Sequence, residues 1–180
     1  FVGNPTDEVP LFEVENGFRI LRSEPGFVEI SLPKYPYPVR LLHTAFANEQ
    51  RLKTYFGEEK QRSLQETLQG KWMDLCTRFC DQSGVNLLCS HLFMLKKGDT
   101  MPEEPEGEKP INVGTADLIY TDALPHEIQY AALGHLHRWQ DVGTLQPVVY
   151  CGSPLAYSFS EAGQQKYVSL VELNPGSIAQ

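Results

Sequence analysis

The sequence predicts a single α/β domain with a mostly β core, built as a layer of an α/β sandwich. Short apolar or alternating runs occur near both ends of the chain, and one long helical stripe separates them. The order is therefore strands, helices, and then strands joined by a loop, which fits a layer of a sandwich better than a doubly wound sheet. The sequence also lacks the glycine-rich phosphate loop of a nucleotide-binding fold.

Composition sets the broad class of the protein. The chain has 180 residues, of which 41% are hydrophobic and 21% charged, as in globular domains with a core. No apolar run approaches the roughly 18 to 20 residues of a membrane helix, so we expect no membrane contact. The net charge of −8 disfavours direct binding to phosphate backbones, which depends on clustered Lys and Arg.

The first part of the chain is predicted to be rich in strands. They are expected at Phe1–Gly3, Val9–Asn16, Gly17–Arg22, Phe27–Leu32 and Val39–Phe46. The sequence Ser-Glu-Pro-Gly at residues 23–26 predicts the turn of a hairpin. Residues 33–38 contain three prolines, which indicates an extended connector.

Helices and a second group of strands follow. A short helix is expected at Asn48–Phe56, and a longer one at about Glu58–Gln82. The longer helix carries one apolar stripe for the core, made of Leu64, Leu68, Trp72, Leu75 and Phe79. Later strands are expected at Val85–Cys89, Tyr130–Leu133, Val148–Cys151 and Lys166–Leu173, with an exposed acidic loop at Lys96–Pro110 and a turn or short helix at Asp122–Glu127.

A pair of histidines at the end of the Tyr130 strand is the main candidate for chemistry. Gly134 permits a turn or a close approach, and His135 and His137 are two residues apart, so they point to one side of an extended segment. Neutral imidazole is the commonest metal ligand among side chains. The alternative is that one histidine is structural and the other merely exposed.

The cysteines are expected to be reduced core thiols in a cytoplasmic protein. Cys76 and Cys80 lie four residues apart on one face of the predicted helix, and paired C-x-x-C motifs are absent. An unrelated zinc module built from these two cysteines with His135 and His137 is a remaining alternative.

Three local motifs together resemble one family. His91 follows the Val85 strand, Ala-Leu-Gly-His-Leu-His-Arg occupies residues 132–138, and Tyr-Cys-Gly-Ser-Pro at 150–154 precedes Ser-Phe-Ser-Glu at 158–161. This pattern resembles the calcineurin-like metallophosphoesterases and, within them, the SbcD family of bacterial SbcCD exonuclease subunits. The resemblance covers most of residues 85–173, and the preceding residues match only loosely.

The resemblance implies that the chain is part of a four-layer αββα sandwich, with a two-metal site where strand ends converge. His91 and His135 would share one ion and His137 would bind the other, and family members commonly use manganese. Paired ions of this kind stabilise the attacking and leaving oxygens during displacement at phosphorus. By the same resemblance, the partners would be DNA and an ATPase subunit of the SbcC type, with a second copy of the chain as a further candidate. The process would be DNA repair and recombination.

The chain departs from the family pattern in its missing motifs. The family's D-x-H, G-D-x-x-D and G-N-H-D motifs do not occur, so we expect them upstream of residue 1, and the capping domain beyond Gln180. The chain would then be the second half of a catalytic domain, nearly inactive alone. Alternatives are another metallophosphoesterase acting on nucleotides or small phosphoesters, and a degenerate scaffold for protein binding.

Overall fold

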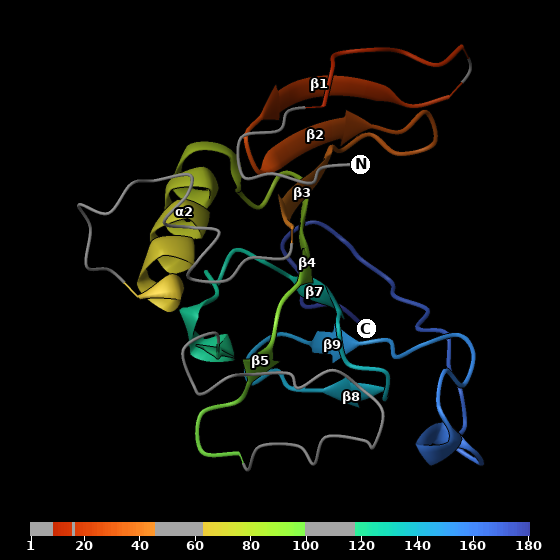
Figure 1. Ribbon diagram of the computed structural model, residues 1–180. Coiled ribbons are helices and arrows are strands. Elements are labelled where there is room, and N and C mark those ends of the chain that lie inside the picture. Colours follow the sequence, from red (N-terminus) through yellow and green to blue (C-terminus); the bar gives the residue numbers. More distant parts are fainter. Residues whose placement is uncertain (1–8, 16, 46–62, 100–117) are drawn as a thin grey trace.

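The computed structural model describes residues 9–15, 17–45, 63–99 and 118–180. It contains a mixed sheet of seven strands and, beside it, the α-helix α2 (Figure 1). The strands of this sheet are β1 (Arg19–Glu24), β2 (Phe27–Ser31), β3 (Val39–Thr44), β4 (Val85–His91), β7 (Tyr130–Gly134), β8 (Gln140–Asp141) and β9 (Val148–Tyr150). The predicted mixed α/β class is confirmed.

The sheet has the order β1-β2-β3-β4-β7-β9-β8. Its centre, from β3 through β4 and β7 to β9, is parallel, whereas both edges are antiparallel. A second sheet pairs β5 (Met94–Leu95) with β6 (Ile119–Tyr120), and the 3₁₀ helices are η1 (Thr121–Ala123) and η2 (Phe159–Glu161). The parallel centre places the carboxyl ends of β4, β7 and β9 at one edge of the sheet.

The predicted hairpin forms at the start of the sheet. Glu24 pairs with Phe27 across the turn, and Gly26 adopts φ +86°, a conformation that favours glycine. The proline-rich connector lies between β2 and β3, as predicted. The strand expected at Val9–Asn16 does not form in the described residues, where only Glu13 makes an isolated bridge to Arg19.

Helix α2 (Leu64–Phe79) links the parallel strands β3 and β4 and covers one face of the sheet (Figure 1). Its start is set by a capping box, in which Ser63 Oγ accepts from the Glu66 amide and Glu66 accepts from the Ser63 amide. It ends three residues before the predicted Gln82, because Cys80 has an extended backbone. The predicted stripe is buried on this side, with Phe79 stacked on Phe27 at 4.8 Å between ring centroids.

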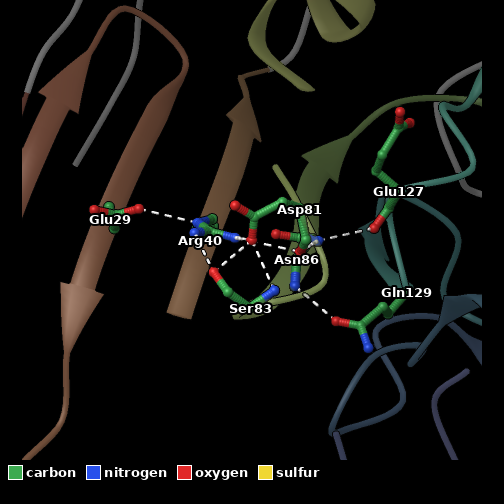
Figure 2. A network of polar contacts seen from close by, with 7 residues as sticks. All are labelled: Glu29, Arg40, Asp81, Ser83, Asn86, Glu127 and Gln129. Atoms are coloured by element: carbon green, nitrogen blue, oxygen red, sulfur yellow. Dashed lines mark hydrogen bonds and ion pairs between the residues drawn. The ribbon is translucent and has the colours of Figure 1, made fainter. Parts of the chain in front are cut away.

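A buried arginine of β3 contacts both β2 and the loop between α2 and β4 (Figure 2). Arg40 on β3 is 6% exposed and donates from Nε to Glu29 on β2 at 3.0 Å. Its Nη1 donates to the Asp81 carboxylate at 2.7 Å, in the loop between α2 and β4. The same loop is bonded to β4, since the Asn86 side-chain amide donates to the Asp81 carbonyl at 3.0 Å. The network therefore fixes the crossover that brings β4 beside β3.

The strand predicted at Lys166–Leu173 does not form. The β9 edge of the sheet is taken by β8, and in the described residues this segment exchanges backbone hydrogen bonds only between Glu172 and Gln180. Val168 and Leu170 are each 96% exposed. Alternation made this segment strand-like, but a strand also needs a neighbouring edge to pair with.

The C-terminal segment instead packs on the sheet face opposite α2. Val171, Leu173 and Ala179 contact a small cluster with Tyr130 and Val149. The predictions at Phe1–Gly3, Asn48–Phe56 and most of the Lys96–Pro110 loop lie outside the described residues. Within the described ranges, no helix combines the length and apolarity needed to cross a membrane.

Replacement of Arg40 by Met should lower the free energy of unfolding by about 3 kcal/mol. It leaves the mostly buried Glu29 carboxylate without its ion-pair partner. The value is at the low end for broken buried ion pairs because the other partner, Asp81, is exposed to water. Urea denaturation measures the change. Arg78→Met, which removes two ion pairs at the surface, with Glu24 and Asp74, is the control and should have little effect. Equal losses in both variants would contradict the role of burial.

Asp81 should make stability depend on pH in the acid range. Hydrogen bonds from Ser83 and Arg40 lower the Asp81 pKa to about 2, against about 3.9 for an unfolded chain. The stabilisation is present above about pH 4 and is lost as the pH falls through about 2. Unfolding curves of wild type and Asp81→Asn should therefore converge on acidification. A stability difference independent of pH would contradict this.

Candidate metal centre at the strand ends

The parallel register of β4 and β7 brings two of the predicted histidines together. His91 is the last residue of β4 and pairs in register with Gly134, the last residue of β7, after which His135 follows directly. The His91 and His135 rings lie 5.3 Å apart between centroids, at an interplanar angle of 77°. Both imidazoles thus meet at the carboxyl edge of the sheet, where the sequence predicted them.

Close backbone packing shapes this pair. A Cβ on Gly134 would lie 2.9 Å from Nδ1 of His91, so glycine lets the ring sit directly against β7. His135 has φ 108°, in a region that side-chain-bearing residues rarely adopt. Such a conformation costs on the order of 1–3 kcal/mol and occurs mostly at functional sites. The strain lets the chain turn out of the sheet while His135 stays beside His91.

The environment of the two rings favours neutral imidazole. Burial lowers the pKa of His91, and the nearby His137 lowers it further. Burial also lowers the pKa of His135, with contributions from His91 and then His137. Neutral imidazole is the form that coordinates metal ions, so this environment suits ligand chemistry.

The segment after His91 is anchored by Tyr150 at the end of β9. The fully buried Tyr150 hydroxyl donates to the Leu92 carbonyl at 2.8 Å and accepts from the Met94 amide at 2.7 Å. On the preceding side, Ser90 Oγ donates to the Thr44 carbonyl at 3.1 Å. His91 therefore sits between two anchored residues, which limits the movement of its backbone.

His137 is held separately, by the loop after β9. The Ser153 amide donates to the His137 carbonyl at 3.1 Å, and Gly152 makes this approach possible, because a Cβ there would lie 2.8 Å from the same carbonyl. On the ring, Nδ1 lies 3.0 Å from Oε1 of Glu161, and Tyr157 is 5.5 Å away between centroids. Both the backbone and the ring of His137 are thus restrained.

Glu161 is a buried carboxylate with several donors around it. It is 1% exposed, and its Oε2 accepts from Lys166 Nζ at 2.6 Å and lies 3.1 Å from Ser153 Oγ. Hydrogen bonding from Lys166, then from His137 and Ser153, overcomes the effect of burial and lowers the Glu161 pKa to about 2. Glu161 is therefore ionised at neutral pH and can only accept hydrogen bonds.

Glu161 and Lys166 are the site residues that sequence reasoning missed. The sequence marks Glu161 only as the end of the Ser-Phe-Ser-Glu motif, and Lys166 only as the start of a predicted strand. Their spacing of five residues matches no regular ligand pattern, and η2 with the turn after it brings them together. The one sequence signal that could have found Glu161 is that Ser-Phe-Ser-Glu occurs in the same chain as the G-H-x-H motif.

The donors of this chain fit the imidazole part of a metal site but do not complete one. In the described part of the chain, no group of three or more His, Cys, Asp or Glu side chains is placed to hold a metal ion. The zinc module of Cys76, Cys80, His135 and His137 is accordingly not assembled. As predicted, Cys76 is a buried thiol of α2 and Cys80 is partly buried, but Cys89 and Cys151 are exposed and are not core thiols; all four cysteines are free.

Known proteins similar to this chain include bacterial nuclease subunits. The chain is 42% identical over 96 residues to the SbcD subunit of nuclease SbcCD from Bacillus subtilis, which is 53% of this chain and 23% of the relative. It is 34% identical over 128 residues to the SbcD subunit of nuclease SbcCD from Escherichia coli K12, 68% of this chain and 30% of the relative. These relatives confirm that the chain resembles part of an SbcD subunit.

The match covers a limited part of the relatives. The chain spans less than a third of the length of these curated proteins. No model of a protein family matches the sequence. The similarity to SbcD thus establishes a relationship to named nuclease subunits, while the metal-binding roles of His91, His135 and His137 stay predictions.

Replacement of Gly134 by Ala should separate the His91 and His135 rings. The new methyl would lie too close to His91 Nδ1, so the ring or β7 must move, and overpacking of this kind costs about 1–3 kcal/mol. Chemical denaturation and the NMR signals of the two rings measure the effect. Gly70→Ala on α2, which meets no atom within 4 Å, should instead stabilise the protein by about 0.5–1 kcal/mol. Unchanged ring signals in the Gly134 variant would contradict the close packing.

Proposed function

We propose that this chain contributes the histidine half of the catalytic site of a metal-dependent DNA exonuclease. The main support is the juxtaposition of His91 and His135 at the ends of paired strands, in a chain similar to named nuclease subunits. His137 would be the third ligand. In this proposal the remaining donors come from other parts of the full-length protein, and the chain alone has little or no activity.

The roles of this chain's residues are derived from their surroundings. His91 and His135, neutral because of burial, would offer lone pairs to one divalent ion, and His137 to a second. Imidazole ligands, together with carboxylates from elsewhere, suit manganese. When bound, two such ions stabilise charge on the phosphoryl oxygens and lower the pKa of a bound water. The protein's part is to fix the three rings at the sheet edge.

The proposed substrate is DNA, and the proposed partner an ATPase subunit of the SbcC type, in a cytoplasmic complex for repair and recombination. The relatives' name, which assigns them to nuclease SbcCD, supports both. A net charge of −8 is unfavourable for binding a phosphate backbone. Much of the DNA contact is therefore assigned to the partner and to bound cations. Association of two copies of the full-length protein stays a prediction from the family resemblance.

The test compares histidine variants of the full-length protein on linear duplex DNA with Mn²⁺. Replacing His91, His135 or His137 by Gln should each reduce cleavage on the order of a hundredfold or more, because several kcal/mol of transition-state stabilisation is lost. His126→Gln is the matched control, since that side chain is 87% exposed and takes no part in the proposed site. Full activity in all three variants would overturn the proposal.

Two further comparisons separate the proposed nuclease from its alternatives. Faster hydrolysis of nucleotides or bis-p-nitrophenyl phosphate than of DNA would indicate another phosphodiesterase. The chain of 180 residues should show at most trace cleavage under the same conditions, and robust activity would contradict a site completed by other segments. Absence of cleavage by the full-length protein with its partner would favour a scaffold.

A further inference from the structure

We propose that Glu161, locked in place by Lys166, is a positioning residue that holds His137 in one tautomer, with the proton on Nδ1 and the lone pair on Nε2. This inference rests on the proposed function only in taking Nε2 as the ligating nitrogen. The tautomer itself can be observed without metal or substrate. The sequence marks Glu161 as the end of a motif but assigns no role in the site to Glu161 or to Lys166.

The chemistry of the Glu161 carboxylate places the proton. Its two oxygens serve different partners, because Oε1 faces His137 Nδ1 at 3.0 Å, while Oε2 accepts from Lys166 at 2.6 Å. A carboxylate beside an ammonium group is an acceptor only. The hydrogen between Glu161 and His137 must therefore belong to the ring, on Nδ1.

The arrangement around the carboxylate is rigid. Glu161 is 1% exposed, so water does not compete for its oxygens. Lys166 Nζ also donates to Ser153 Oγ at 2.8 Å, and the Ser153 amide holds the His137 carbonyl. Lys166 thus connects the carboxylate to the same loop that restrains the His137 backbone. The ring cannot rotate without breaking a charge-assisted bond in a buried place.

A fixed tautomer prepares His137 for a metal ion. A histidine that binds a metal through Nε2 must carry its proton on Nδ1, and a hydrogen bond from Nδ1 to a carboxylate sets both the tautomer and the ring direction. His91 and His135 lie against each other at the ends of β4 and β7. His137 lies farther along the loop, where such a carboxylate replaces the restraint of the sheet.

Because Lys166 can only donate, the proposal predicts a change of the His137 tautomer in the variant Glu161→Gln. The side chain keeps its size, but one oxygen becomes an NH₂ group. Lys166 can only donate, so it retains the amide oxygen and turns NH₂ toward Nδ1. Nδ1 must then accept, and the proton moves to Nε2. The variant should show the opposite tautomer while remaining folded.

The double variant Glu161→Gln, Lys166→Met should reverse the change. Without the ammonium group, the amide can flip, presenting its oxygen to Nδ1 and its NH₂ to Ser153 Oγ. The proton returns to Nδ1. If Glu161 and Lys166 had only a structural role, the double variant would not restore the tautomer, because each substitution in the buried cluster would further disturb the packing around His137. Glu172→Gln, at an exposed carboxylate, is the control and should leave the tautomer unchanged.

The experiment records imidazole ¹⁵N NMR spectra of the metal-free full-length protein at alkaline pH, with His137 assigned by its Gln variant. Expected are a protonated Nδ1 in wild type, a protonated Nε2 in the single variant, and recovery in the double. A wild-type ring protonated on Nε2, or a single variant with an unchanged tautomer, would overturn the proposal. The wild-type spectrum decides even if a variant fails to fold.

Metal titration of the same samples separates this inference from the proposed function. Affinity for Mn²⁺ should fall about 10- to 100-fold in Glu161→Gln and recover in part in the double variant. If the tautomers change as expected but wild type binds no Mn²⁺, the positioning role holds and the proposed function fails. If Mn²⁺ binds equally to wild type and single variant, the positioning role is overturned while the proposed function stands.

Discussion

The parallel pairing of β4 with β7 is the constraint on which the rest of the site depends. Because the strands run in the same direction and in register, His91 and Gly134 end beside each other, and His135 continues from that point. Glycine at this position allows ring and backbone to touch. The pairing depends in turn on the α2 crossover, which delivers β4 next to β3, and on the Arg40 network that secures it.

The site combines two ways of placing an imidazole. His91 and His135 are placed by the sheet, one as a strand residue and the other by a strained turn directly after a strand. His137 lies beyond the sheet and is placed by a buried carboxylate, a lysine and a serine. The first way costs backbone strain, and the second costs the desolvation of two charges, which their mutual contact offsets.

The C-terminal segment shows where local pattern and tertiary structure diverge. Residues 166–173 alternate as a strand would, yet they form none, since the β9 edge is occupied by β8. The apolar side chains of this segment fall into two groups. Val171 and Leu173 pack under Tyr130 and Val149, whereas Val168 and Leu170 stay in solvent. Lys166, at the start of the segment, is used by the site rather than by a sheet.

By itself the sequence determined the mixed α/β class, the hairpin at Pro25, the α2 stripe, the four central strands and the family resemblance. Each of these depends on local periodicity or on a contiguous motif, so each is visible in short windows of sequence. Only the tertiary structure decided that His91 and His135 touch, that Glu161 is buried with Lys166, and that residues 166–173 form no strand. These outcomes depend on which segments, distant in sequence, pack against the same sheet edge or the same buried side chain. Such pairings leave no periodic pattern in the sequence.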